Sequence, residues 1–231
     1  MADTKKIKIP ITDEAPINAI FSSPNEKGKY PAIVYMHGGA VRERGNPVYK
    51  PNGTLLFDIN DKIKDMSSMG IVVLAPLRNT VAGCCNGDNA VREGISIAKS
   101  SVKYLRSLPY VLKDKVCLLG FSEGALISMW AMTEPNDYSK AIIMSPSNQC
   151  GMRRAGSKNY CGSNLVQSGK LENIKKKIIL TLGDSERSGH IKTTKGFAEK
   201  LSQDINILKG NHNSFTIPRE DVKSIIRDHC T

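Results

Sequence analysis

Short apolar runs rich in β-branched residues alternate along this chain with longer stretches of helical periodicity. The runs show little polar alternation, which is typical of strands buried on both faces of a parallel sheet. The sequence therefore predicts an α/β fold, with a mostly parallel central sheet and helices on both of its faces. We expect buried strands at 17–21, 32–36, 71–75, 116–119, 141–144, 178–182 and 205–208, a half-exposed edge strand at 5–9, and helices at 55–69, 89–108, 122–132, 193–202 and 219–228.

No repeat, low-complexity tract or linker divides the 231 residues, and this length suits one large single-sheet domain. We therefore expect residues 1–231 to form a single domain. The longest apolar stretch, 71–77, is too short to span a membrane, and the first residues lack the apolar region of a signal peptide. The net charge of +11 is scattered, with 175–177 as the only tight basic run and no interleaved aromatic residues, so neither a nucleic acid nor a membrane is expected as a partner.

The positions of the six cysteines indicate the kind of cellular compartment in which the protein works. Cys84, Cys85, Cys150 and Cys161 lie in polar segments rich in Gly and Asn, where disulfide bonds usually occur, whereas Cys117 lies in an apolar run and is expected to be a small buried side chain. Six cysteines allow fifteen pairings, among which the sequence does not choose. We expect an oxidised, exported protein rather than a cytoplasmic one. The spacing of cysteines and histidines fits no metal site, and no cofactor is expected.

One pentapeptide, Gly120-Phe121-Ser122-Glu123-Gly124, follows the predicted strand at 116–119 and precedes an apolar helical stretch. A G-x-S-x-G motif between a strand and a helix forms a sharp turn that lifts the serine oxygen clear of the backbone. The context predicts that Ser122 is a nucleophile, which requires a neighbouring base held by a third group.

The base is expected to be His212, which follows the last predicted strand and precedes the last helix. His37 is expected to hydrogen bond within its own loop, His190 to contact the site or its loop, and His229 to lie on the surface. The orienting acid should follow a strand between Ser122 and the histidine in sequence. The strand at 178–182 is followed by two candidates, Asp184 and Glu186.

The turn after the strand at 32–36 reads His37-Gly38-Gly39-Ala40. Backbone N–H groups there can approach a substrate and stabilise the negative charge that develops on its carbonyl oxygen. The expected donors of this oxyanion hole are the amides of Glu123 and Gly39, with Ala40 as the alternative to Gly39. For Arg78, which follows the strand at 71–75, solvation or structural ion pairing is favoured over binding of a substrate carboxylate.

From about residue 17 to 228 these motifs resemble an α/β-hydrolase of the dienelactone-hydrolase-like group, which is related also to the catalytic domains of acyl-peptidase-type serine peptidases. The resemblance implies an α/β-hydrolase fold with no large lid domain. In that group the acid stands three residues after the glycine that ends the strand, which is Glu186 here. The usual residue is aspartate, so Asp184 stays an alternative.

Dienelactone hydrolases proper carry a cysteine nucleophile where this chain has Ser122, so the lactone activity is not carried over. The expected reaction is hydrolysis of small carboxylic esters through an acyl-enzyme, by a monomer or a homodimer without a cofactor. A small-peptide or thioester hydrolase of the same fold is an alternative, and a non-catalytic basic binding protein on a hydrolase scaffold is another. The cysteine-bearing segments 78–88 and 145–170 follow strand ends and are expected to border the site.

Overall fold

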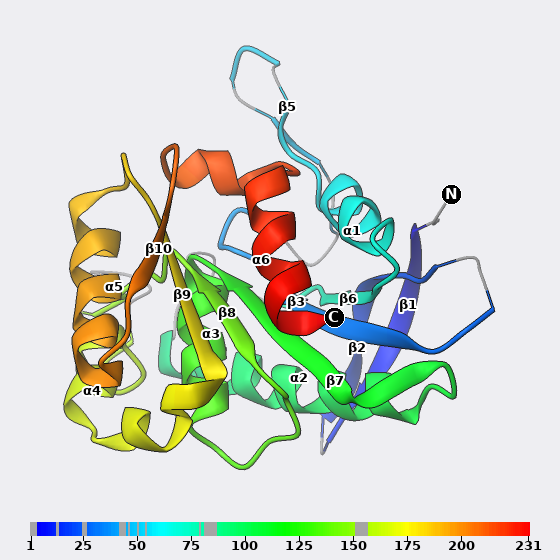
Figure 1. The fold of residues 1–231 in the computed structure, drawn as a ribbon, viewed down its shortest axis with the longest axis horizontal. Coiled ribbons are helices and arrows are strands. Elements are labelled where there is room, and N and C mark those ends of the chain that lie inside the picture. The colour runs from blue at the N-terminus through cyan, green and yellow to red at the C-terminus, as the bar shows by residue number, and fades with distance from the viewer. Residues whose placement is uncertain are drawn as a thin grey trace.

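The computed structural model describes residues 4–12, 14–24, 27–41, 45, 47–49, 51–53, 55–78, 80, 87–150 and 157–231. Eight strands form one sheet in the order β1-β2-β6-β3-β7-β8-β9-β10. The first two steps of this order are antiparallel and the others are parallel (Figure 1). The strands are β1 (Thr4–Ile11), β2 (Glu14–Ser22), β3 (Tyr30–Met36), β6 (Val72–Pro76), β7 (Val111–Phe121), β8 (Ala141–Met144), β9 (Ile178–Gly183) and β10 (Ile205–Leu208). Two short strands, β4 (Val48–Tyr49) and β5 (Leu55–Phe57), pair with each other separately.

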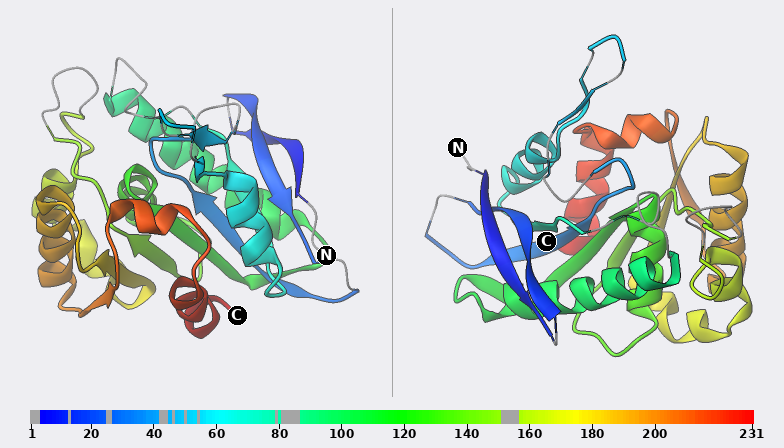
Figure 2. Two further views of the ribbon diagram at one scale, coloured as in Figure 1. Left: turned by 90° about the horizontal axis from the view of Figure 1, so that it is seen from above. Right: turned by 180° about the vertical axis from the view of Figure 1, so that it is seen from behind.

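Helices cover both faces of the sheet (Figure 2). Successive strand residues point to opposite faces, so that Val34 and Met36 belong to one core and Ile33 and Tyr35 to the other. The first core contains residues of α2 (Gly87–Ser107), α3 (Glu123–Met132) and α5 (Ser188–Leu201), and the second those of α1 (Ile59–Ser67) and α6 (Glu220–Cys230). The predicted parallel sheet with helices on both faces is confirmed. No helix in the described ranges has the length and apolar character needed to cross a membrane.

Several predicted boundaries are wrong, for local reasons. The helix expected at 55–69 begins only at Ile59, because Asp58 caps it by accepting a hydrogen bond from the Asn60 amide, and 55–57 forms a strand instead. The helix expected from 122 begins at Glu123. The segment 145–170, expected as a loop, includes α4 (Gly162–Gln167), and 3₁₀ helices occur at η2 (Lys170–Lys177) and η3 (His212–Thr216).

Two disulfide bonds lie among the described residues. Cys117 on β7 is bonded to Cys230 at the end of α6, and Cys150 is bonded to Cys161. The expectation that Cys117 is merely a small buried residue is therefore wrong, because the apolar surroundings that bury a free thiol bury a half-cystine equally well. Cys150 and Cys161 had been expected in disulfides without a chosen partner, while Cys84 and Cys85 lie outside the described residues.

Candidate active site

Ser122 lies at the sharp turn from β7 into α3, with a φ of 55°. The glycines on either side make this turn possible. A Cβ at Gly124 would lie 2.0 Å from the carbonyl oxygen of Met36, and one at Gly120 would lie 2.5 Å from Ser128 Oγ. A larger residue at Gly124 would push the turn away from β3, and one at Gly120 would push it away from α3, so close packing requires both motif glycines.

His212 begins the short helix η3, which follows β10 and is fixed by a capping box between Asn211 and Ser214. Its Nε2 lies 3.0 Å from Ser122 Oγ, and its Nδ1 lies 2.9 Å from Glu186 Oε2. Because an ionised carboxylate only accepts hydrogen bonds, Nδ1 carries the proton and Nε2 is left to accept one from the serine hydroxyl. The three side chains form one hydrogen-bonded line from carboxylate to nucleophile.

The two acidic candidates after β9 have different partners. Glu186 is buried and accepts hydrogen bonds from His212 and from the Arg187 amide. Burial would raise the pKa of this carboxyl, but the hydrogen bonds from His212 and the Arg187 amide outweigh it and lower the pKa to about 2. Asp184 is exposed and accepts instead from the Gly210 amide at 2.9 Å and from the Ser185 hydroxyl at 3.0 Å. Asp184 thus ties the end of β9 to the loop that leads to His212.

Two aromatic rings flank His212. The His190 ring stacks on it with ring centroids 4.1 Å apart, and the Phe121 ring lies at 4.8 Å. His190 Nδ1 donates to the carbonyl oxygens of Ser145 and Pro146, at 3.0 and 3.1 Å. Burial, and then the proximity of His212, lower the pKa of His190. The stacking was not predicted from the sequence, although a histidine four residues after the acid at the start of a helix was a usable signal.

A cavity of about 510 Å³ opens above Ser122. Its floor includes the turn after β3, where the Val41 amide bonds the Gly38 carbonyl at 3.3 Å and leaves Gly39 and Ala40 at the centre of the turn. The cavity lining also contains apolar residues, a polar segment after β8 and residues of the first turn of α5; these include Val41, Phe57, Phe121, Ser147, Asn148, Gln149, Arg187 and Gly189.

His37, at the start of the same turn, is fully buried, and its Nδ1 lies 2.9 Å from the Gly38 carbonyl oxygen. Burial, together with the nearby positive charge of Arg78, lowers the pKa of His37 to about 3. His37 therefore stays neutral, and its ring forms a hydrogen bond within its own loop, as expected from the sequence.

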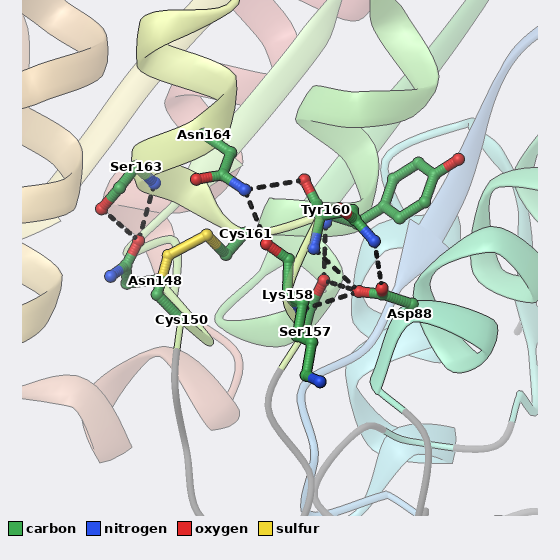
Figure 3. The surroundings of a disulfide bond; sticks show 10 residues. Asp88, Asn148, Cys150, Ser157, Lys158, Tyr160, Cys161, Ser163 and Asn164 are labelled. Atoms are coloured by element: carbon green, nitrogen blue, oxygen red, sulfur yellow. Dashed lines mark hydrogen bonds between the residues drawn. A yellow bond between two sulfur atoms is a disulfide. The ribbon is translucent and has the colours of Figure 1, made fainter.

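Cys150 lines the cavity, so its disulfide bond with Cys161 forms part of the cavity rim. Figure 3 shows the surroundings of this bond. Asp88, at the start of α2, accepts hydrogen bonds from the Ser157 hydroxyl and from the amides of Lys158 and Asn159. Burial would raise the pKa of Asp88, but these bonds lower it to about 2. On the other side, Asn148 Oδ1 accepts from the Ser163 amide and hydroxyl at 2.8 and 3.0 Å. The rim is thus attached to both α2 and α4 (Figure 3).

A buried ion pair lies beside this site. Arg78 Nη1 is 2.6 Å from Glu123 Oε1, and the two side chains are 0% and 2% exposed. The structural ion pairing favoured for Arg78 is therefore found, with a partner that the sequence did not identify. An arginine two residues past a fully buried strand was the available signal.

One cluster among the described residues has three potential metal-ligating side chains, namely Glu186, His190 and His212, whose ligand atoms all lie within 4.8 Å of one another. Both ring nitrogens of His212 are already engaged, with the carboxylate and with Ser122. This arrangement suits proton transfer along the hydrogen-bonded line.

Comparison with known proteins gives no match to a family model. The uncharacterized peptidase YtmA of Bacillus subtilis is 26% identical over 127 residues, which is 55% of this chain and 45% of that protein. An acylaminoacyl peptidase of Pyrococcus horikoshii has a TM-score of 0.68 and 14% identity over 99% of this chain, which corresponds to 42% of the peptidase. The chain thus spans less than half the length of these two proteins.

An esterase of Pyrococcus furiosus is similar over almost its whole length. Its TM-score is 0.70 at 17% identity, over 98% of this chain and 91% of the esterase. Both peptidases and esterases thus share the arrangement of strands and helices seen here. Together with the eight-stranded, mostly parallel sheet, these likenesses show that the chain has the α/β-hydrolase fold.

Proposed function

We propose that this protein is a serine hydrolase of small carboxylic esters, in which Ser122 is the nucleophile, His212 the general base and Glu186 the group that orients the histidine. The observation that carries the proposal is the hydrogen-bonded line through these side chains, with distances of 3.0 Å and 2.9 Å. Its serine end opens into a cavity of about 510 Å³.

In the proposed reaction, Ser122 Oγ attacks the ester carbonyl carbon while His212 Nε2 takes up the hydroxyl proton. Glu186 stabilises the imidazolium that forms. The amides of Glu123 and of Gly39, or of Ala40 in its place, donate to the oxygen that becomes negatively charged. The tetrahedral intermediate collapses as the histidine returns its proton to the leaving alcohol, and water then hydrolyses the acyl-enzyme in the same way.

The electrostatics of the cavity favour a neutral ester over a peptide with a free amino terminus. Glu123 is the only acidic residue among the described lining residues, and its carboxylate is bound by Arg78. A substrate ammonium group would therefore find no unpaired carboxylate within the described part of the cavity. A relation to the dienelactone-hydrolase-like group, in a form with a serine nucleophile, is part of the proposal; the G-x-S-x-G turn and the acid three residues after Gly183 support it.

Peptide hydrolysis is the second candidate. It is supported by the similarity to YtmA and to the acylaminoacyl peptidase, two proteins named as peptidases. A blocked peptide, with no free ammonium group, would avoid the electrostatic objection. The same three side chains could also serve a thioester.

We further propose that the protein works in an oxidising compartment outside the cytoplasm, as a single-domain monomer or homodimer. The two disulfide bonds support this proposal, because such bonds persist where thiols are not kept reduced.

The test is a panel of p-nitrophenyl esters of increasing acyl length, with an aminoacyl anilide, an N-acetylated peptide anilide and a thioester as comparisons. We expect the highest kcat/KM for a short ester. A fluorophosphonate probe should label wild-type protein and leave the Ser122→Ala variant unlabelled. Equal labelling of that variant would contradict the proposal by placing the nucleophile elsewhere, and no labelling of either protein would contradict it in favour of a non-catalytic binding protein.

A further inference from the structure

Arg78 is 1% exposed and has one of the largest fully buried side chains of the described residues. It lies two residues past β6, the strand that pairs with β3, so it is adjacent to the turn that follows β3. Its guanidinium contacts two acceptors that belong to described residues. Nη1 binds Glu123 Oε1 at 2.6 Å, and Nη2 donates to the carbonyl oxygen of His37.

These two acceptors belong to the two segments that supply the proposed oxyanion donors. Glu123 supplies its own amide, in the first turn of α3. His37 precedes the turn whose centre is Gly39 and Ala40. One rigid, planar side chain is therefore bonded to both halves of the oxyanion site, which come from parts of the sequence about 85 residues apart.

The two segments are also in direct backbone contact. A Cβ at Gly124 would lie 2.0 Å from the Met36 carbonyl oxygen and 2.5 Å from that of His37. Without Arg78, the His37 carbonyl would lose a buried donor, and its peptide plane would rotate towards another one. Because the C=O and N–H of a peptide lie in one plane, that rotation would also turn the Gly38 amide and the turn that follows it.

The buried ion pair of Arg78 and Glu123 is not explained by stability alone. Desolvation of two buried charges commonly cancels their attraction, and apolar residues of similar volume often stabilise a fold equally well. An arginine that binds both a carboxylate and a carbonyl fixes the orientation of these two groups, which apolar packing does not do.

We propose that Arg78 is a positioning residue that holds the two oxyanion-binding segments in their relative orientation by binding Glu123 and His37 at once. The inference rests on the proposed function, because it concerns the oxyanion site of that reaction. Arg78 does not touch the substrate in this proposal, and its charge is balanced by Glu123, so its effect on the reaction is geometric.

The test separates positioning from stability with Arg78→Met, Glu123→Met and the double variant. Each single change removes one member of the buried ion pair and should lower the thermal midpoint, whereas the double variant should regain most of the loss. The double variant should nevertheless keep a kcat about 10- to 100-fold below wild type, with KM within about twofold, because a displaced oxyanion donor weakens only the transition state. Its affinity for a trifluoromethyl ketone, which forms an oxyanion on the serine, should fall by the same factor as kcat/KM.

Glu134→Gln is the matched control, because it breaks a half-exposed ion pair with Lys99 on the surface of α2 and should leave kcat unchanged. A stable double variant with wild-type kcat would overturn the proposal. If the double variant does not fold, Arg78→Lys decides the matter. Lysine keeps the charge but lacks the planar fork, so the proposal requires a lowered kcat at a near-native thermal midpoint, and a wild-type kcat would overturn it. Failure of the proposed function looks different, since wild-type protein would then not react with the fluorophosphonate probe.

Discussion

Lys62 on α1 donates a hydrogen bond to the carbonyl oxygen of Phe215, three residues past His212, at 3.1 Å. A second bond from the same ammonium group reaches the Ile217 carbonyl at 3.0 Å. Lys62 is 2% exposed, and Asp65, Arg219 and Asp221 are the charged groups that act on it electrostatically. A buried lysine thus fixes the end of the short helix that carries the proposed base.

Lys62 should make stability depend on pH. Burial lowers the pKa of Lys62 from 10.5 to about 8 in the folded protein. Between these values the unfolded chain binds the proton and the folded one does not, so the free energy of unfolding should rise with pH, by at most about 1.4 kcal/mol per pH unit. Urea unfolding of wild type and Lys62→Met at pH 8, 9 and 10 should show this rise in wild type only. The exposed Lys64→Met on the same helix is the control, and parallel profiles for wild type and Lys62→Met would refute the prediction.

Replacement of the two acids after β9 should give very different results. Glu186→Gln removes the carboxylate that holds His212 Nδ1–H, and we expect kcat to fall by about 10³- to 10⁴-fold. Asp184→Asn keeps an oxygen that can accept from the Gly210 amide, so kcat should stay within about threefold of wild type. Steady-state kinetics on one ester measure both variants, and a larger loss for Asp184→Asn would reverse the assignment of the acid.

The acid side of the pH profile of kcat/KM should reflect a single group, the proposed general base. The pKa of Glu186 is about 2 and that of His37 is about 3, so neither changes its charge above about pH 5. We expect kcat/KM to fall with a slope of one proton as His212 becomes charged, because a protonated imidazole cannot accept the serine proton. The His190→Asn variant should show the same fall in kcat/KM, with a slope of one proton. A profile that stayed flat on acidification would contradict the assignment of His212 as base.

The two disulfides should differ in what they stabilise. Cys117 and Cys230 are 113 residues apart and Cys150 and Cys161 are 11 apart, so loop entropy predicts losses of about 5 and about 3 kcal/mol when each pair is replaced by alanine. The change in KM should instead be larger for loss of the bond between Cys150 and Cys161, because Cys150 lines the cavity. Denaturant unfolding and ester kinetics of the two double-alanine variants measure both effects, and a larger KM change for the Cys117 and Cys230 pair would count against the prediction.

The sequence was sufficient to place Ser122, Glu186 and His212 at the same edge of the sheet. Each follows an apolar run that forms a parallel strand, and the carboxyl ends of such strands meet at one edge. Which of Glu186 and Asp184 contacts His212 could be found only from the coordinates, because two residues in one tight turn can point to opposite sides of the chain.

Other features depend on how distant elements come together. The bond between Cys117 and Cys230 requires the last turn of α6 to pack against the middle of β7, and no local pattern specifies that packing. The contact of Arg78 with Glu123 requires the strand order β6-β3-β7, in which two strands that follow each other in the chain lie on either side of β3. Helix α1 begins later than expected because Asp58 caps it. The apolar periodicity of the sequence extends to both sides of Asp58 and so does not mark this start.

The bond between Cys117 and Cys230 has a further consequence. Ser122, Glu186 and His212 all lie between these two cysteines, so the proposed catalytic residues belong to one covalently closed ring of the chain. A protease that cut this ring once would leave its two fragments joined through sulfur, and the serine could not diffuse away from the histidine. Under reducing conditions the same cut would release the two fragments. The protein should therefore tolerate a single cut in this ring only where the disulfide is kept oxidised.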